Sequence, residues 1–280
     1  MRHRRFLNNT VSYAILIILA AIFLFPLVWM IVSSFKQNAQ IYNDFGSVKA
    51  FLPPRPHVGY FLNYTIDFSN VPLIRQAFNS LFYTALIVAG NLIVNSMAGY
   101  AFARLNFPLK RFLFALLIAL LVFPSEILLF PQYIIIYKLG WINSYAALVM
   151  PAVADAFSIY ILRQFFLGIP AELEEAARID GASALRIFVQ VVLPLSKPVL
   201  ATVAVLSFVA HWNDFLWPLI VTTSSQMGTI QIGLQALFGA KVTQWGQITA
   251  GLTFATIPMI IVFSLFQKYY VQGLKYTGGK

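Results

Sequence analysis

Long apolar segments without a charged residue dominate this chain and restrict it to a membrane fold. Residues 11–35, 76–103 and 246–267 contain no Asp, Glu, Lys or Arg. A bilayer core of about 30 Å is crossed by about 20 helical residues that rise 1.5 Å each. Each of these segments is therefore long enough for one transmembrane helix.

Three further segments are apolar but carry ionisable side chains. They are 112–130 with Glu126, 141–162 with Asp155, and 198–223 with His211 and Asp214. The whole chain is 60% hydrophobic and 10% charged, whereas soluble domains carry about 25% charged residues. We therefore predict an all-α, polytopic membrane protein with six transmembrane helices, organised as a single domain over residues 1–280.

The basic residues predict the orientation, because Lys and Arg of short loops stay on the cytoplasmic side. With both termini inside the cell, 13 of the 19 Lys and Arg residues are cytoplasmic. These are Arg2, Arg4, Arg5, Arg104, Lys110, Arg111, Arg163, Arg178, Arg186, Lys197, Lys268, Lys275 and Lys280. The loop 163–197 is then cytoplasmic and the loop 224–245 external. Anionic lipid headgroups explain the net charge of +10 without a nucleic acid partner.

Several functional classes lack support in the sequence. The first apolar segment is longer than the 7–15 residues of a signal-peptide core, so we expect an uncleaved span. There is no cysteine, and three scattered histidines predict no metal site. The nearest approach to a P-loop, residues 273–280, has Gly279 where the lysine must stand. We expect no catalytic residue and no cofactor in this chain.

The loop 163–197 has the pattern of two short helices. Glu172, Glu174 and Glu175 crowd the start of the first, where carboxylates complement the helix dipole. Leu173, Ala176 and Ala177 share one face, and Glu174 and Arg178 are spaced as an i, i+4 pair. These features predict a helix over 171–179.

The next residues predict a turn and a second helix. Gly181 suits a left-handed residue that ends the first helix, and Ser183 suits the N-cap of the second. Leu185, Phe188, Val189 and Val192 have helical spacing, and Pro194 precedes the return to the membrane. The small residues Ala176, Ala177, Gly181 and Ala182 would let the backbone of a partner come close.

This loop resembles the cytoplasmic loop of binding-protein-dependent ABC importer permeases. Their pattern of E-A-A, D-G-A and L-P matches Glu175-Ala176-Ala177, Asp180-Gly181-Ala182 and Leu193-Pro194. Residues 212–218, 233–234 and 267–274 also resemble the carbohydrate branch of this family, and in particular its MalG-like second permease subunit. The resemblance covers essentially the whole chain.

The resemblance implies a type I, MetI-like permease fold and an importer assembled from several subunits. A MalF-like second permease, two cytoplasmic ATPases that bind ATP and magnesium, and an external sugar-binding protein would complete it in a bacterial or archaeal cell membrane. The residues that would couple this chain to the ATPase are Glu174, Glu175, Ala176, Ala177, Asp180, Gly181, Ala182, Leu193 and Pro194. The alternative is a loop that packs only against its own spans.

Polar groups inside the spans are candidates for a translocation path, because each costs free energy unless it faces a cavity or a partner. The candidates are Asn91, Asn95, His211, Trp212, Asn213 and Asp214. Hydrogen bonds between helices and aromatic anchors near the headgroups are the alternative explanation. For Glu126 and Asp155 this structural explanation is the preferred one.

The external loop 224–245 reads as a run of turns around apolar residues. In the resembling family this loop faces the binding protein, so Leu234, Phe238 and Gly239 are candidate contacts, with a simple connecting loop as the alternative. Other functions stay open: a permease for amino acids, peptides or phosphate, a secondary transporter, and a polytopic membrane enzyme.

Overall fold

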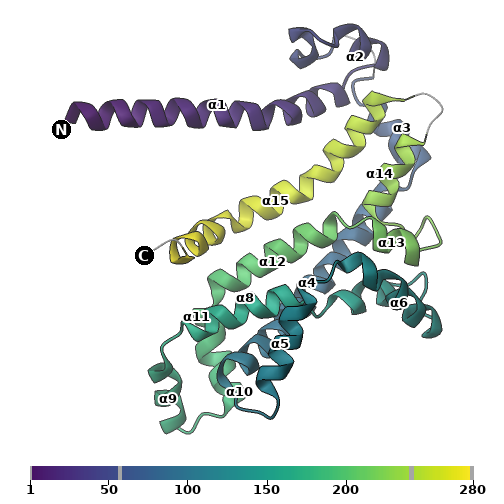
Figure 1. Cartoon of the computed structure of the whole chain (residues 1–280). Coiled ribbons are helices and arrows are strands. Elements are labelled where there is room, and N and C mark those ends of the chain that lie inside the picture. The colour runs from purple at the N-terminus through teal and green to yellow at the C-terminus, as the bar shows by residue number, and fades with distance from the viewer. Residues whose placement is uncertain (1, 56–58, 240–242, 278–280) are drawn as a thin grey trace. The chain divides into compact units, whose positions relative to one another are not determined.

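The computed structural model describes residues 2–55, 59–239 and 243–277, and their side chains over 12–55, 59–124, 126–239 and 243–267. These residues form helices joined by turns, without a strand in the described part, which confirms the all-α prediction (Figure 1). Six basic residues that support the predicted orientation lie near the termini, where side chains are not described: Arg2, Arg4, Arg5, Lys268, Lys275 and Lys280. Lys241 also lies outside the described residues.

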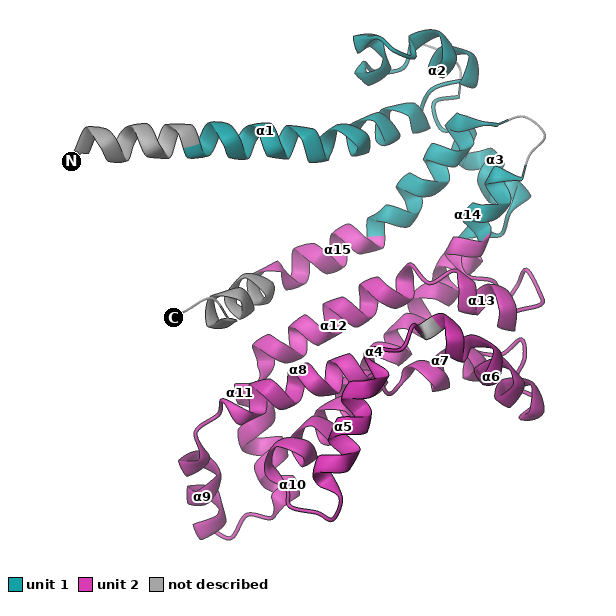
Figure 2. Cartoon of the chain, viewed as in Figure 1, with its two compact units in different colours: residues 1–74, 233–257 teal, residues 75–232, 258–280 magenta. Residues whose placement is uncertain are grey.

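The chain divides into two compact units, which Figure 2 shows in different colours. Unit 1 comprises residues 1–74 and 233–257, and unit 2 comprises residues 75–232 and 258–280. The single-domain organisation remains a prediction.

Unit 1 contains α1 (Arg2–Ser34), α2 (Asn38–Asp44), the 3-10 turn η1 (Val48–Phe51), α3 (Leu62–Asn70), most of α14 (Ile230–Phe238) and the first part of α15 (Trp245–Thr277). The Asn63 amide joins α3 to the end of α1, since it donates to the carbonyls of Ser34 at 2.8 Å and Lys36 at 2.9 Å. Phe68 of α3 packs edge-on against Phe254 of α15.

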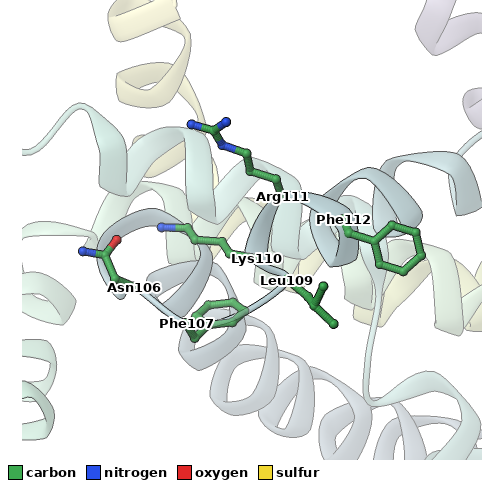
Figure 3. Close-up of a pocket in the computed structure, with 6 residues that line it drawn as sticks. All are labelled: Asn106, Phe107, Leu109, Lys110, Arg111 and Phe112. Atoms are coloured by element: carbon green, nitrogen blue, oxygen red, sulfur yellow. The ribbon is translucent and has the colours of Figure 1, made fainter.

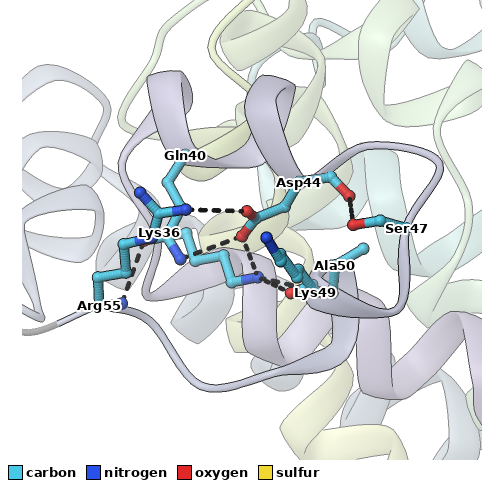
Figure 4. A network of polar contacts seen from close by, with 7 residues as sticks. All are labelled: Lys36, Gln40, Asp44, Ser47, Lys49, Ala50 and Arg55. Carbon is cyan, nitrogen blue, oxygen red and sulfur yellow. Dashed lines mark hydrogen bonds and ion pairs between the residues drawn. The ribbon is translucent and has the colours of Figure 1, made fainter.

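A buried lysine organises the segment after α1 (Figure 4). Lys36 is 1% exposed, and its ammonium group lies 3.1 Å from a carboxylate oxygen of Asp44. It also donates to the carbonyls of Lys49 and Ala50, at 2.8 and 3.2 Å. The exposed Arg55 lies 3.7 Å from the other oxygen of Asp44. One cation thus holds α2 and η1 together.

Unit 2 contains α4 (Leu73–Arg104) and the helices that pack around it. They are α5 (Lys110–Leu120), α6 (Ser125–Lys138), α7 (Tyr145–Val149), η2 (Met150–Ala152), α8 (Ala156–Leu167), α9 (Ala171–Ile179), α10 (Ala184–Ile187), the π-helical turn η3 (Phe188–Val192), α11 (Leu193–Leu195), α12 (Lys197–Trp212) and α13 (Leu216–Val221). A Cβ on Gly99 would lie 3.0 Å from the Leu162 Cβ, so α4 and α8 pack backbone to backbone.

The three uncharged segments form unbroken helices, as predicted. Ser12–Ser34, Leu73–Arg104 and Trp245–Gln267 are each long and apolar enough to cross a bilayer. Within the described residues, two bent pairs also pass this test: Tyr145–Ala152 with Ala156–Leu167, at 41°, and Ala184–Leu195 with Lys197–Trp212, at 80°. Length and composition therefore support three spans, or up to five if each bent pair is one span.

The three segments that carry ionisable residues are not continuous helices, and this corrects the prediction. Segment 112–130 is divided between α5 and α6 at Pro124, segment 141–162 is interrupted between η2 and α8, and segment 198–223 between α12 and α13. At the first break, Pro124 explains the interruption, because the residue before a proline avoids helical geometry. At all three breaks an acid stands near the start of the next helix: Glu126, Asp155 and Asp214. A carboxylate is favourable there because the helix dipole is positive at that end.

Asp67 is a buried carboxylate without a hydrogen-bond partner among the described residues. It is 1% exposed in α3, and both of its oxygens are unpaired. Burial raises its pKa to about 7. An unfolded Asp titrates near 3.9, so this group stabilises the fold least when it is ionised, and stability falls as the pH rises from about 4 to about 7.

We therefore expect Asp67→Asn to raise the thermal unfolding midpoint of the purified chain at pH 8. The gain should be about 1–3 kcal/mol and should vanish near pH 4, because the neutral amide removes the cost of ionising a buried carboxylate, which is about 1.4 kcal/mol for each unit by which the pKa is raised. Asp44→Asn is the matched control and should lower the midpoint, because it breaks the ion pair with Lys36. A midpoint for Asp67→Asn that stays below that of the wild type at pH 8 would contradict this account of Asp67.

Candidate functional site

The predicted loop helix is present over the range that the sequence indicates. α9 spans Ala171–Ile179, follows Pro170, and carries Glu172 and Glu174 in its first turn and Arg178 in its last. Acids at the start and a base at the end both complement the helix dipole. Within unit 2, α9 and α10 lie at one end, and α6 and α13 at the other (Figure 2).

The turn after α9 is a Schellman motif. Gly181 has a φ of +80°, its N–H donates to the Arg178 carbonyl, and the Ala182 N–H donates to the Ala177 carbonyl, both at 2.9 Å. Ser183 then caps α10 by accepting a hydrogen bond from the Arg186 N–H. These contacts confirm the predicted turn and cap. The small D-G-A segment thus has a role in the fold of its own chain.

The buried face of α9 differs from the predicted one. Glu174 is 4% exposed, whereas Leu173 is 45% exposed. Within the described part of the chain, the ion pair of Glu174 is with Arg104 of α4 at 2.9 Å, so the predicted pair with Arg178 is wrong. Ala177, one turn further along, packs against the core of unit 2 together with Ala182.

The second helix of the loop is also interrupted. After α10 the chain makes the π-helical turn Phe188–Val192, which shifts the helical phase. Ile187, Phe188 and Val192 are buried as a result, while Leu185 and Val189 are exposed, contrary to the predicted apolar face. Pro194 stands in the first turn of α11 and has no N–H to donate back to this turn.

Leu193 and Pro194 stand just before a sharp change of direction. The helical segments Ala184–Leu195 and Lys197–Trp212 meet at 80°. The Ser196 hydroxyl at the corner is buried and donates to the Val192 carbonyl at 2.7 Å. The L-P pair therefore marks the point where the loop turns into α12.

One surface of the loop remains open for a partner. Leu173, Glu175, Ala176 and Gly181 are exposed, and Ile179 is 87% exposed. Exposed apolar side chains beside small residues on a rigid helix suit docking into a complementary groove. Nothing within 4 Å would contact a Cβ on Gly181.

Asn91 and Asn95 of α4 bind the broken backbone between η2 and α8. The Asn91 amide donates to the carbonyls of Ala152 and Val153, at 2.7 and 3.1 Å. Asn95 donates to Asn91 and accepts from the Asp155 N–H, and both asparagines are buried. Asp155 caps α8 through the Ser158 N–H at 2.7 Å. These contacts match the structural explanation for Asn91, Asn95 and Asp155.

The other four candidate path residues come together at the break between α12 and α13. Trp212 is 1% exposed and stacks on Phe208. Asn213 is exposed, His211 and Asp214 are half-buried, and Asp214 accepts a long hydrogen bond of 3.4 Å from the Trp217 N–H. The Asn213 amide donates to the Val209 carbonyl, so His211, Asp214 and Asn213 are partly open to a solute, whereas the Trp212 ring lies in the core.

The loop 224–245, which the sequence predicts to be external, contains a helix where turns were expected. α14 spans Ile230–Phe238, and Leu234 and Leu237 pack where a Cβ on Gly251 of α15 would stand. Leu234 is accordingly buried, whereas Phe238 and Gly239 are exposed. Phe238 and Gly239 at the end of α14 can contact a partner directly. Leu234 instead packs against α15 and supports α14.

A pocket of about 450 Å³ lies at the connection between α4 and α5, and none of the candidate site residues lines it (Figure 3). Its lining is Asn106, Phe107, Leu109, Lys110, Arg111 and Phe112. Lys110 donates to the Leu105 carbonyl at 2.7 Å, and so provides a hydrogen-bond partner for the backbone just after α4. Burial, and then the charge of Arg163, lower the pKa of Lys110.

Two buried residues of α4, Asn79 and Tyr83, were not identified from the sequence as candidates. Tyr83 donates a hydrogen bond to the His211 carbonyl, and Asn79 donates to the carbonyls of Gln226 and Gly228. Asn79 and Tyr83 are spaced i, i+4, as are Asn91 and Asn95, so each pair shares one face of α4 and this local spacing was the available signal. Among the described residues, no group of three His, Cys, Asp or Glu could hold a metal ion.

Substitutions of Gly181 separate backbone strain from side-chain size. Gly181→Val should lower the stability of the chain by about 1–2 kcal/mol, because a β-branched residue strongly disfavours a left-handed φ. Gly181→Asn should cost much less, because asparagine tolerates that conformation. Thermal unfolding of the purified variants measures both. Equal losses for the two variants would contradict the assignment of Gly181 to a Schellman turn.

The comparisons with known proteins agree with this geometry. Residues 95–276 match the family model "Binding-protein-dependent transport system inner membrane component". The chain is 34% identical over 268 residues to the sn-glycerol-3-phosphate transport system permease protein UgpE of Yersinia enterocolitica, covering 94% of each chain. It is 35% identical over 272 residues to the arabinooligosaccharides transport system permease protein AraQ of Halalkalibacterium halodurans, covering 97% of this chain and 95% of that one.

A solved structure shares the fold. It belongs to a bacterial ABC transporter involved in the import of the acidic polysaccharide alginate, with a TM-score of 0.80, 26% identity, and coverage of 96% of this chain and 98% of that one. The MetI-like permease fold is thereby confirmed. Since the family model matches well over half of the chain, the protein belongs to the family of binding-protein-dependent transport system inner membrane components.

Proposed function

We propose that this chain is a permease subunit of an ATP-driven, binding-protein-dependent carbohydrate importer. The observation that carries the proposal is α9, a capped helix whose open face presents Leu173, Ala176 and Ile179 at one end of unit 2. A family of transporter components supplies the context. In this proposal α9 is the coupling helix, and the ATPase that receives it is a separate subunit.

The class of solute is inferred from the relatives. The printed names of three similar proteins refer to sn-glycerol-3-phosphate, arabinooligosaccharides and alginate. All three solutes are rich in hydroxyl groups. The exposed or half-buried Asn213, His211 and Asp214 offer hydrogen-bonding groups that suit hydroxyls. A carbohydrate is therefore the proposed solute, and a polyol phosphate is the second candidate because of the glycerol-phosphate relative.

The proposed assembly contains a second permease, two ATPase subunits and an external binding protein. The proposed location is the inner membrane with both termini and α9 in the cytoplasm. Lys36 supports this orientation, because its charge is buried against Asp44 and is not a free cation on the outer side. The exposed Phe238 and Gly239 at the end of α14 are the proposed contacts of the binding protein.

The docking role can be tested by purifying the chain with its ATPase from a membrane that contains the complete transporter. Glu175→Lys reverses a charge on the open face of α9 and should reduce the bound ATPase at least about tenfold, which corresponds to 1.4 kcal/mol. Gln190→Lys, exposed on the same loop but outside α9, is the control and should retain most of it. Equal retention in both variants would contradict docking through Glu175.

Transport by the reconstituted assembly tests the solute class and the energy source. ATP-dependent uptake of a neutral oligosaccharide that needs the binding protein is the expected result. Preferential uptake of glycerol phosphate would select the second candidate. Uptake by the chain alone without ATP would replace the proposal with a secondary transporter.

A further inference from the structure

Glu174 attaches the proposed coupling helix to α4 through a buried ionic contact. Its carboxylate lies 2.9 Å from the Arg104 Nε and accepts a hydrogen bond of 3.1 Å from the Tyr100 hydroxyl. The Arg104 guanidinium also donates to the Ile169 carbonyl, just before α9 begins. The last turn of α4 therefore holds both the approach to α9 and α9 itself.

The choice of glutamate at this buried position is informative. Burial of a carboxylate costs several kcal/mol, and a buried ion pair is often no more stabilising than well-packed apolar residues. Leu173 is the adjacent residue, yet it is 45% exposed while Glu174 is 4% exposed. Packing alone would favour the leucine inside. The ion pair is thus better explained by a need for one defined attachment between α9 and α4.

Tyr100, which holds Glu174, is itself packed in the core of unit 2. The Tyr100 ring packs against Phe166 of α8 and Phe188 of the π-helical turn, with ring centroids 6.3 and 5.1 Å apart. Tyr100, Phe166, Phe188 and Val192 belong to one buried cluster. Because close-packed cores transmit displacement with little compression, a shift of α9 reaches α4 and α8 together.

α4 connects this attachment to the breaks in the other helices. Asn95 and Asn91 lie up to about 20 Å along the helix from Arg104, at 1.5 Å per residue, and bind the break before α8. Tyr83 lies about 30 Å from Arg104 by the same rise and binds the carbonyl of His211, at the break after α12. One helix thus contacts α9 at one end and both breaks along its length.

We propose that Glu174 is a positioning residue that fixes α9 to the Arg104 end of α4, so that displacement of α9 by the ATPase moves α4 and the breaks bound to it. This inference rests on the proposed function, in which α9 docks on an ATPase. It assigns different tasks to neighbouring glutamates: Glu175 faces the partner, and Glu174 faces its own chain.

The test uses the complete transporter in liposomes and measures two quantities for each variant, the bound ATPase and the solute imported per ATP hydrolysed. Glu174→Gln keeps the size of the side chain and removes its charge. It should retain the ATPase but lower the solute imported per ATP at least about fivefold, the low end of typical coupling between sites. Gln190→Glu, an exposed residue of the same loop that lies outside α9, should leave both quantities unchanged.

A second variant covers the case in which Glu174→Gln fails to fold. Tyr100→Phe removes only the hydroxyl that donates to Glu174 and keeps the ring in its cluster, so it should lower the same ratio to a smaller extent. An unchanged ratio in Tyr100→Phe would overturn the inference, and so would an unchanged ratio, or loss of the ATPase, in a Glu174→Gln variant that folds. Failure of the wild-type chain to bind an ATPase would instead overturn the proposed function.

Discussion

The polar side chains of α4 hold unit 2 together. A membrane interior offers no water to unpaired backbone groups, so each break in a helix needs partners from the protein. α4 supplies them at two of the three breaks: Asn91 binds the carbonyls of Ala152 and Val153, and Tyr83 binds that of His211. Asn79 binds the carbonyls of Gln226 and Gly228 in the loop before α14. The interrupted helices around α4 depend on these contacts.

This dependence explains what the sequence could and could not predict. The three uncharged segments were recognised from length and hydropathy, because a continuous apolar helix satisfies its own backbone. Residues 171–179 were recognised because dipole charges, a C′ glycine and a serine cap are local signals. The breaks at Pro124, before Asp155 and at Asp214 were not predicted. Their acids were read as polar groups inside spans, whereas they stand where new helices begin.

The partner of Glu174 was missed for a different reason. Arg104 and Tyr100 lie about 70 residues away in the chain, and the local pattern offered Arg178 at the favourable i, i+4 spacing. Tertiary packing overrode this local preference because Ala177 turns inward with Glu174. The same contact separates the two adjacent glutamates of α9, one of which is buried and one exposed.

The central claim is that α9 and the Arg104 end of α4 move as one body. The chain has no cysteine, so Arg178→Cys and Asn106→Cys would introduce two spin-label sites into this subunit, at exposed positions of α9 and of the residues after α4. The partner subunits would be cysteine-free variants. Double electron–electron resonance spectroscopy then measures the distance between the two labels in the complete transporter. The account predicts the same distance distribution without nucleotide and with ATP bound. A mean distance that changes when ATP binds would contradict it.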